Sequence, residues 1–393
     1  MKLLLTFTFS FSLLCSFAQN TALEQAKILI EDKKYESAYN LLDSADPENK
    51  EPEIVIAKTD LLLEYFVSSI MHQMFAVTDL QPEQDILDLR GSEGSFTMVS
   101  FTPDSVLLDL IEAYPENYEL RRTLGAYYHD VYIRYAGRWF ISGEELMGKF
   151  NANYLLAYEN GVMDYRSTFG IGFAYLVVEK YAEAIPFLEE STALNPDYPT
   201  SHYNLAYAYM QMDRREDGIA SAQKALGLYD DLIYKADAAQ LIAVLYNELD
   251  NSEKAIEYYR IANEIDAGDY SVMYALLDLE VTAGKDGYQD RTSEFFTSDP
   301  ENPTIYQDLL RIYLTNDKGD ELLSFLTTQL PTYEENDLVS ANLQFYLGVT
   351  YFELKDLANA KPAFEQASQV FGRVFEPDHP VFEVINSYLE QME

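Results

Sequence analysis

The chain contains few of the side chains on which metal and disulfide chemistry depend. Its 393 residues include one cysteine, Cys15, and one tryptophan, Trp139. A single thiol cannot close an internal disulfide, and zinc sites built on cysteine need several. The four histidines are His72, His129, His202 and His379. They are far apart and form no HExxH pair, so we expect no metal and no cofactor.

Basic residues are scarce as well. The chain has 27 Lys and Arg against 66 Asp and Glu, which gives a formal net charge of -39. Such a chain repels nucleic-acid phosphates and anionic membrane surfaces, so neither is an expected partner. The same charge would attract basic partners or divalent cations. The favoured interpretation, however, is a solvated acidic surface that keeps the protein soluble, and a partner recruited by charge is the alternative.

Motifs for catalysis are missing too. No glycine-rich phosphate loop follows a strand pattern, no serine stands in a nucleophile elbow, and no DxDxDG calcium loop is present. Carboxylates are so abundant that any two could be proposed as an acid and a base, which removes the value of that signal. We therefore expect a protein that is not an enzyme.

The first residues have the pattern of an export signal. Lys2 supplies a positive charge, and Leu3 to Leu14 is apolar apart from threonine and serine. Small residues at Ser16 and Ala18 predict cleavage directly after Ala18. The apolar run is too short to span a bilayer, and no other segment approaches the roughly 18 apolar residues that a transmembrane helix needs. We expect residues 1–18 to be a signal peptide and the mature chain to be periplasmic or extracellular, without a transmembrane segment.

Cys15 raises an alternative, an outer-membrane lipoprotein anchored through that cysteine. The residue before it is Leu14, where a lipoprotein signal has glycine, alanine or serine. Soluble export is therefore the favoured interpretation. Cleavage after Ala18 would leave a mature chain without any cysteine.

A pair formed by a small residue and a tyrosine returns along the chain at a spacing of about 34 residues. The four clearest copies are Gly172 with Tyr175, Ala206 with Tyr209, Ala243 with Tyr246, and Gly348 with Tyr351. Three copies are followed by a further alanine, at Ala184, Ala255 and Ala360. This period predicts stacked helical hairpins, because small residues allow two helices to cross closely.

These residues resemble the signature of the tetratricopeptide repeat family. The family's unit of about 34 residues is a helix A, a tight turn and a helix B. The resemblance is strongest over 165–198, 199–235, 236–269 and 341–374, and it is weaker over 270–302 and 303–340. It implies an all-α fold, a right-handed superhelical solenoid of antiparallel helix pairs.

The sequence predicts four parts. Residues 1–18 are the signal peptide, and 19–117 are N-terminal helical repeats interrupted by an insert at 70–103. Residues 118–374 are tetratricopeptide-like repeats. Residues 375–393 form a C-terminal capping helix, which a solenoid needs to cover its last apolar face.

The insert at 70–103 has an expected structure of its own. Pro82 breaks the helical pattern, and the segment from Gly91 to Gly94 indicates a turn. Ser95 to Phe101 then favours a short strand, for which Met74 to Val77 is the expected partner.

The candidate binding residues follow from the family resemblance. In tetratricopeptide repeats, fixed positions of helix A face a concave groove. In two adjacent units these positions hold Phe169, Phe173, Leu176, Tyr203, Tyr207 and Met210. Together they would form an apolar and aromatic patch suited to a protein or peptide ligand. The alternative is that the superhelix itself or the 70–103 insert covers the patch.

The resemblance implies a non-catalytic role, an exported scaffold or adaptor that mediates protein–protein interaction. The alternative is an envelope protein that binds a glycan or another nutrient, because aromatic rings also stack on sugars. Under that alternative Trp139 would be a ligand platform, whereas under the first interpretation it anchors a loop.

Overall fold

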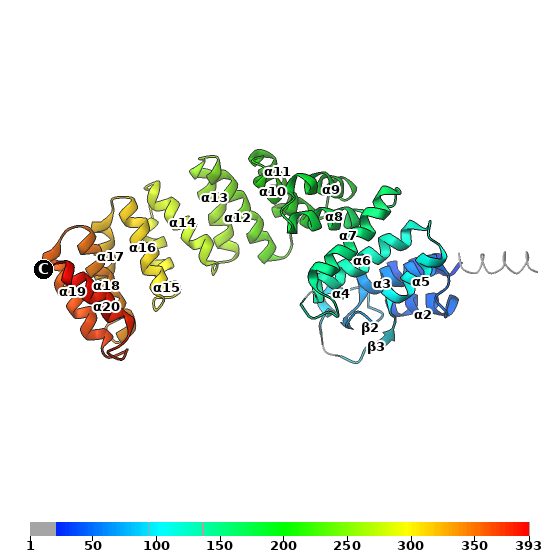
Figure 1. Cartoon of the computed structure of the whole chain (residues 1–393), viewed down its shortest axis with the longest axis horizontal. Coiled ribbons are helices and arrows are strands. Elements are labelled where there is room, and N and C mark those ends of the chain that lie inside the picture. The colour runs from blue at the N-terminus through cyan, green and yellow to red at the C-terminus, as the bar shows by residue number, and fades with distance from the viewer. Residues whose placement is uncertain (1–20, 93, 136, 393) are drawn as a thin grey trace, which may run out of the picture. The chain divides into compact units, whose positions relative to one another are not determined.

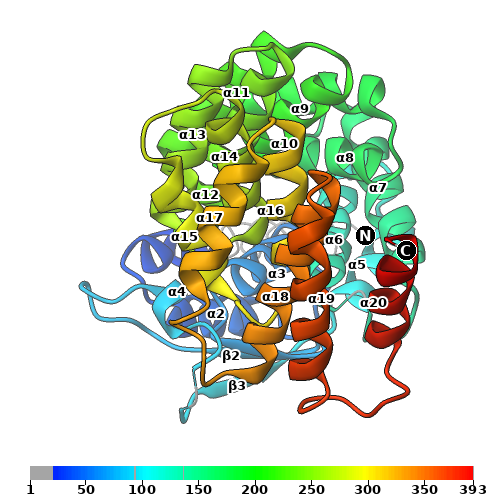
Figure 2. The same ribbon diagram turned by 90° about the vertical axis from the view of Figure 1, so that its left-hand side faces the viewer.

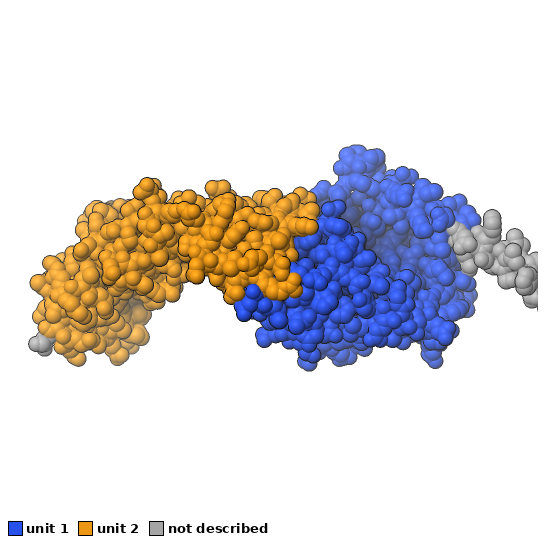
Figure 3. Space-filling model, turned by 90° about the horizontal axis from the view of Figure 1, so that it is seen from above, with its two compact units in different colours: residues 1–213 blue, residues 214–393 orange. Residues whose placement is uncertain are grey.

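The computed structural model describes residues 21–92, 94–135 and 137–392, and almost all of their regular structure is helical (Figure 1). The chain divides into two compact units, Met1–Asp213 and Arg214–Glu393 (Figure 3). None of the helices in the described ranges combines the length and the apolar character that a bilayer crossing requires. The predicted signal peptide lies outside the described residues.

Unit 1 is built from helices that pack against their neighbours in sequence. After a helical segment at 21–31 come α2 (Tyr35–Ala45), α3 (Pro52–Tyr65), α5 (Pro103–Ala113), α6 (Tyr118–Tyr135), α7 (Gly143–Glu159), α8 (Tyr165–Val177), α9 (Tyr181–Leu194) and α10 (Pro199–Gln211). A continuous apolar core runs from the segment at 21–31 to α8 and includes Leu42, Leu62, Leu124 and Phe150. A second apolar cluster, with Leu188 and Leu205, joins α8, α9 and α10.

Unit 2 continues the pattern of paired helices. Its elements are α11 (Arg215–Leu228), α12 (Leu232–Glu248), α13 (Ser252–Ile265), α14 (Tyr270–Thr282), α15 (Tyr288–Ser298), α16 (Pro303–Thr315), α17 (Gly319–Gln329), α18 (Asp337–Glu353), α19 (Leu357–Phe371) and α20 (Pro380–Gln391). The weakly matching segments 270–302 and 303–340 therefore each contain a helix pair, as their apolar spacing predicted.

The small residues of the repeat signature lie where two helices cross. A Cβ atom added to Gly172 would fall 2.7 Å from Cγ of Leu188, and one added to Gly125 would fall 2.6 Å from the Tyr154 ring. Both distances are far below van der Waals contact, so the absence of a side chain is what lets helix A approach helix B. In unit 2, Gly348 has the same relation to the Phe364 ring.

A left-handed residue marks the turn between helix A and helix B in most repeats. It is the fifteenth residue of its unit, counting from 165 in the unit that holds Glu179. The set is Lys33, Glu179, Asp213, Asp250, Gly284, Asp317 and Lys355. In at least six of these turns the next backbone N–H donates to the carbonyl five residues earlier, for example Lys180 to Tyr175 (2.9 Å) and Lys318 to Tyr313 (2.8 Å). This geometry satisfies a carbonyl left unpaired at the end of helix A.

The insert forms a small sheet beside α3 and α6. Its elements are β1 (Ser68–Ile70), β2 (Met74–Val77), α4 (Ile86–Leu89) and β3 (Thr97–Ser100), with the strand order β1-β2-β3. β2 pairs with β3 in antiparallel register, with Met74 opposite Ser100 and Val77 opposite Thr97, which confirms the predicted pairing. The sequence did not predict β1, a strand of three residues that pairs with β2.

The last helix, α20, covers the end of unit 2. Figure 2 shows α18, α19 and α20 side by side. Ile385 of α20 is fully buried, and the Tyr388 ring stacks on Phe364 of α19 with a centroid distance of 4.8 Å. The helix expected within 375–393 is therefore present and begins at Pro380.

The predicted division of the chain into four parts stays a prediction. The chain passes from the first compact unit to the second between Asp213 and Arg214, inside the segment 118–374 that the sequence assigns to one run of repeats. The boundary between residues 117 and 118 stays a prediction.

Candidate functional site

The six predicted binding residues lie on α8 and α10, which are the first helices of two successive repeats in unit 1. Two of them are interior, because Phe169 is 6% exposed and Leu176 is 8% exposed. Three others, Phe173, Tyr203 and Met210, are half-buried. Tyr207 is 37% exposed. We use the name aromatic face for Phe173, Tyr203, Tyr207 and Met210, the four that reach the surface.

Ring contacts explain why Phe169 is covered. It stacks on Phe173 with a centroid distance of 5.9 Å, and the edge of Tyr198 meets it at 5.6 Å. Phe173 also packs against Tyr132 of α6 at 6.0 Å. Phe169 is thus a packing residue, while Phe173 lies at the junction of α6 and α8 with one side half-open.

His129 of α6 is a buried neighbour of the aromatic face that the sequence did not assign to the site. Its ring lies 6.0 Å from Phe169, 5.9 Å from Phe173 and 4.7 Å from Phe150. Burial lowers the pKa of His129 from 6.5 to about 4, so the ring is neutral at pH 7. Its Nε2 has no hydrogen-bond partner among the described residues. His129 holds the same position counted from Tyr118, where α6 begins, as Leu176 holds from Tyr165 and Met210 from Pro199. Applying the same mapping to the repeat that begins at Tyr118 would therefore have found it.

Tyr207 is the outermost member of the aromatic face. Its ring meets the edge of Tyr181, the first residue of α9, at 6.1 Å. Val177 and Val178, at the end of α8, add exposed apolar surface. A large ring that is partly exposed beside other apolar side chains can still bury substantial area against a partner.

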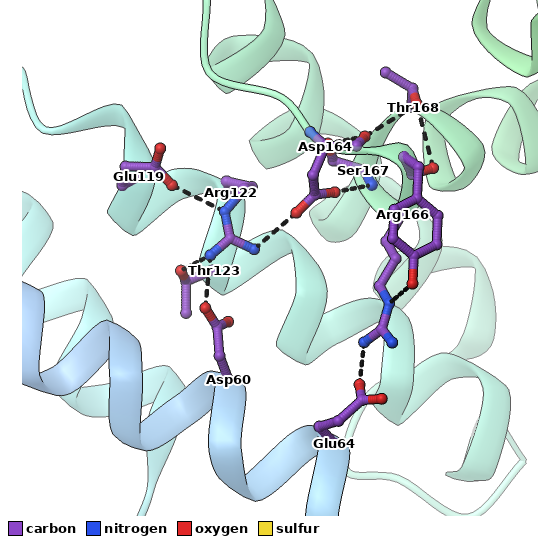
Figure 4. Close-up of polar contacts among 10 residues, drawn as sticks. Asp60, Glu64, Glu119, Arg122, Thr123, Asp164, Arg166, Ser167 and Thr168 are labelled. Atoms are coloured by element: carbon purple, nitrogen blue, oxygen red, sulfur yellow. Dashed lines mark hydrogen bonds and ion pairs between the residues drawn. The ribbon is translucent and has the colours of Figure 1, made fainter. Parts of the chain in front are cut away.

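A network of ion pairs holds the beginnings of α6 and α8 against α3 (Figure 4). The Arg122 guanidinium on α6 donates to Asp60 of α3 at 2.9 Å, to Glu119 at 2.9 Å and to Asp164 at 3.2 Å. Asp164 also caps α8, because its carboxylate accepts from the Ser167 backbone N–H at 2.7 Å. Burial raises the pKa of Asp60, although Arg122 opposes that shift.

A second pair reinforces this arrangement. Arg166 in the first turn of α8 pairs with Glu64 near the end of α3, and its Nε donates to the Tyr165 hydroxyl at 2.8 Å. The two arginines connect three helices at their polar edge, so they fix the spacing of α6 and α8 and with it the position of Phe173.

The structure also brings together a serine, a histidine and an aspartate that are distant in the sequence. His72 Nδ1 lies 2.7 Å from Ser69 Oγ, and its Nε2 lies 2.5 Å from Asp130 Oδ2 on α6. Sequence analysis could not find this set, because it depends on how the insert packs on α6. The three side chains follow one another as in a catalytic serine–histidine–aspartate triad. Whether they could act on a substrate depends on how exposed the His72 ring is.

The surroundings of His72 favour a structural role. The ring is 0% exposed, and Phe66, Phe75 and Tyr135 enclose it at centroid distances of 5.1 to 5.4 Å. Ser69 Oγ has a second hydrogen bond, to the Tyr135 hydroxyl at 2.7 Å. Arg134 Nε donates to Asp130 Oδ2 at 2.9 Å. The set fastens the turn between β1 and β2 to α6, and the buried imidazole has no surface at which a substrate could meet it.

The structure also places Trp139 and the insert, the two remaining features that the sequence analysis linked to the site. Trp139 is half-buried, and its ring packs on Tyr127, Tyr135 and Phe140, the contacts of a loop anchor. The insert contacts α2, α3 and α6, and the Ser37 hydroxyl of α2, for example, donates to the Asp79 carboxylate at 2.6 Å. The aromatic face lies on α8 and α10. Within 21–92, 94–135 and 137–392, no three His, Cys, Asp or Glu side chains form a group that could hold a metal.

Two family models match parts of the chain. The model described as TPR repeat matches residues 172–213, and the model described as Tetratricopeptide repeat matches 199–231, 236–269 and 341–370. No curated protein matches the chain.

Several solved structures are similar to parts of the chain. A tetratricopeptide repeat protein from Parabacteroides merdae has 16% identity and a TM-score of 0.38, over 63% of this chain and 93% of its own. YrrB, described as a TPR protein with an unusual peptide-binding site, has 14% identity and a TM-score of 0.34, over 61% of this chain and 97% of its own. MamA from Desulfovibrio magneticus has 14% identity and a TM-score of 0.36, over 44% and 92%. The family models, together with the small-residue helix crossings, show that this chain contains tetratricopeptide repeats.

Proposed function

We propose that the protein is a non-catalytic scaffold that binds a protein or peptide through the aromatic face. The observation that supports this most directly is Tyr207, a large ring left 37% exposed on α10, the helix that also carries half-buried Tyr203 and Met210. Half-buried Phe173 lies on α8, the first helix of the preceding repeat. Aromatic side chains with one open side are the groups that contribute most to binding energy at protein interfaces.

The side chains beneath the aromatic face are held in place by packing and ion pairs, so the face has its binding shape before a ligand arrives. Phe173 packs on Tyr132 and on Phe169, and the Arg122 and Arg166 pairs hold the helices that carry these rings. A preformed face loses little conformational entropy when a ligand binds, so more of the contact energy appears as affinity.

The charge of the chain supports a partner with basic residues. With a net charge of -39, an acidic partner would be repelled on approach, whereas a basic one would be steered towards the surface. The proposed ligand is therefore a segment with apolar or aromatic side chains flanked by lysine or arginine.

We further propose that the scaffold works outside the cytoplasm, in the periplasm or the extracellular space. The support is the pattern of Lys2, the apolar run from Leu3 to Leu14 and the small residues before Gln19. The intact mass of the mature protein tests this. A chain that begins at Gln19 agrees with the proposal, and a diacylglyceryl mass on Cys15 shows an anchored lipoprotein instead.

A photo-crosslinking amino acid placed at Tyr207 tests the binding proposal in a cell-envelope extract. We expect a discrete crosslinked product from position 207. The matched control is the same amino acid at Tyr234, which is more exposed, at 56%, but lies on α12. If position 234 gives the same products as position 207, the aromatic face is not a specific surface.

A further inference from the structure

An open cleft of about 760 Å³ lies on unit 1, away from the aromatic face. It is formed by the connection between α5 and α6 and by the end of α7. The side chains that matter for its chemistry are Tyr114, Glu116, Asn117, Tyr118, Glu119 and Asn160. Neither the predicted patch nor the repeat signature includes any of them.

The lining of the cleft carries negative charge without a cation to match it. It contains two carboxylates and no lysine, arginine or histidine. Glu119 is engaged by Arg122 at 2.9 Å, but Glu116 forms no ion pair among the residues that the structure describes. Glu112 and Glu159, in the last turns of the two helices whose ends line the cleft, are exposed carboxylates as well. A positive ligand group would therefore meet an uncompensated field.

The helix ends add to that field. Tyr114 is the residue that ends α5, and Asn160 is the residue that ends α7, so two helix C-termini meet at the cleft. Each C-terminus has the effect of about half a negative charge. The positive N-terminus of α6 is also present, but Glu119 in its first turn offsets it.

The uncharged groups of the cleft also suit a cation that donates hydrogen bonds. Tyr114 is 47% exposed and Tyr118 is half-buried, so both can offer ring surface to a cation. The Asn160 amide nitrogen donates to the Leu156 carbonyl at 2.8 Å, which leaves its amide oxygen as an acceptor. Asn117 supplies a second amide oxygen.

We propose that this cleft binds an organic cation, an ammonium or guanidinium group held between the tyrosine rings and Glu116. The same chemistry is offered by a lysine or arginine side chain of a protein partner and by a free polyamine. The site is separate from the aromatic face, so it does not depend on the function proposed above.

Calorimetric titration of the full chain at physiological salt distinguishes the sources, with spermidine, a lysine-rich octapeptide and maltotriose as probes. We expect one saturable site for spermidine, the octapeptide or both. Tyr114→Ala and Glu116→Gln should each weaken that site about fivefold, which corresponds to about 1 kcal/mol. Tyr114→Phe keeps the ring and should retain the affinity.

Glu334→Gln is the matched control, because it removes one exposed carboxylate from unit 2 and changes the net charge equally. Binding that falls as much in Glu334→Gln as in Glu116→Gln would show diffuse attraction to an acidic chain and would overturn the proposal. Absence of a saturable cation site would overturn it as well. So would maltotriose binding that Tyr114→Ala abolishes, because the cleft would then be a sugar site.

Discussion

The Arg122 guanidinium lies 2.9 Å from the Asp60 carboxylate and 3.2 Å from that of Asp164, so one side chain on α6 joins α3 to the start of α8. Arg122 is largely buried, while its three acidic partners are partly open to solvent. Removing it would leave Asp60, Glu119 and Asp164 close together without a cation. The ion pairs of Arg122 therefore link the packing of α3, α6 and α8 to the N-terminal cap of α8.

We predict that Arg122→Ala lowers the free energy of unfolding by about 2 kcal/mol, because the loss leaves partly buried carboxylates unpaired. Urea denaturation followed by circular dichroism measures the change. Arg373→Ala is the control, since Arg373 pairs with Asp337 in the open. Its expected cost is at most about 0.5 kcal/mol. Equal costs for the two variants would mean that the network is only a surface feature.

His129 should make stability fall as the pH is lowered from 6.5 towards 4. Its pKa is about 4 in the folded protein and 6.5 when unfolded, so the unfolded chain binds the additional proton first in that window. The stabilisation is complete above pH 6.5 and is lost on acidification, by up to about 3 kcal/mol. Denaturation midpoints at several pH values measure it, with His129→Leu as the comparison. A variant whose pH profile over this window matches that of the unmodified protein would contradict the assignment.

Replacing glycine by alanine should have opposite effects on stability at Gly172 and at Gly148. Gly172→Ala places a methyl group 2.7 Å from Leu188 and should destabilise unit 1 by about 1 to 3 kcal/mol, because the crossing helices must separate. Gly148→Ala, in the exposed interior of α7 with nothing within 4 Å, should stabilise by about 0.5 to 1 kcal/mol. Thermal unfolding of both variants tests the pair. Stabilisation by Gly172→Ala would show that the helices have room to spare.

His72→Ala should loosen the insert. The change leaves Ser69 and Asp130 without their shared partner, and we expect a loss of about 2 kcal/mol. The pKa of Asp130, which His72 and Arg134 hold below its ordinary value against the effect of burial, should rise. Hydrogen exchange measured by mass spectrometry should increase in β1, β2 and β3. Unchanged protection in those strands would mean that Phe75 and its core neighbours alone hold the sheet.

Much of the fold follows from the sequence, because helix crossings need small residues at fixed spacing. Gly172 and Gly348 are where the pattern places them. The left-handed turn residue escaped sequence analysis since Glu179, Gly284 and Lys355 share a backbone conformation and not a side-chain type. The left-handed residue can be recognised only after the strong repeats have been aligned. Its position in the alignment then locates the turns in the weak repeats.

The site was harder to predict, since exposure depends on the neighbouring repeat. Phe169 and Phe173 hold similar positions in the pattern, yet Tyr198 from the start of the next repeat covers the first. The pairing of His72 with Asp130 depends on how the insert docks on α6, and no local spacing encodes it.

The affinity of the Tyr207→Asp variant for the partner crosslinked at position 207 tests the central claim most directly. The account predicts a loss of at least about tenfold, because an exposed aromatic anchor would be replaced by a charge in the binding surface. Tyr234→Asp, on α12, should leave the affinity unchanged. Equal binding by Tyr207→Asp and the unmodified protein, with both folded, would show that the aromatic face is not where this protein holds its partner.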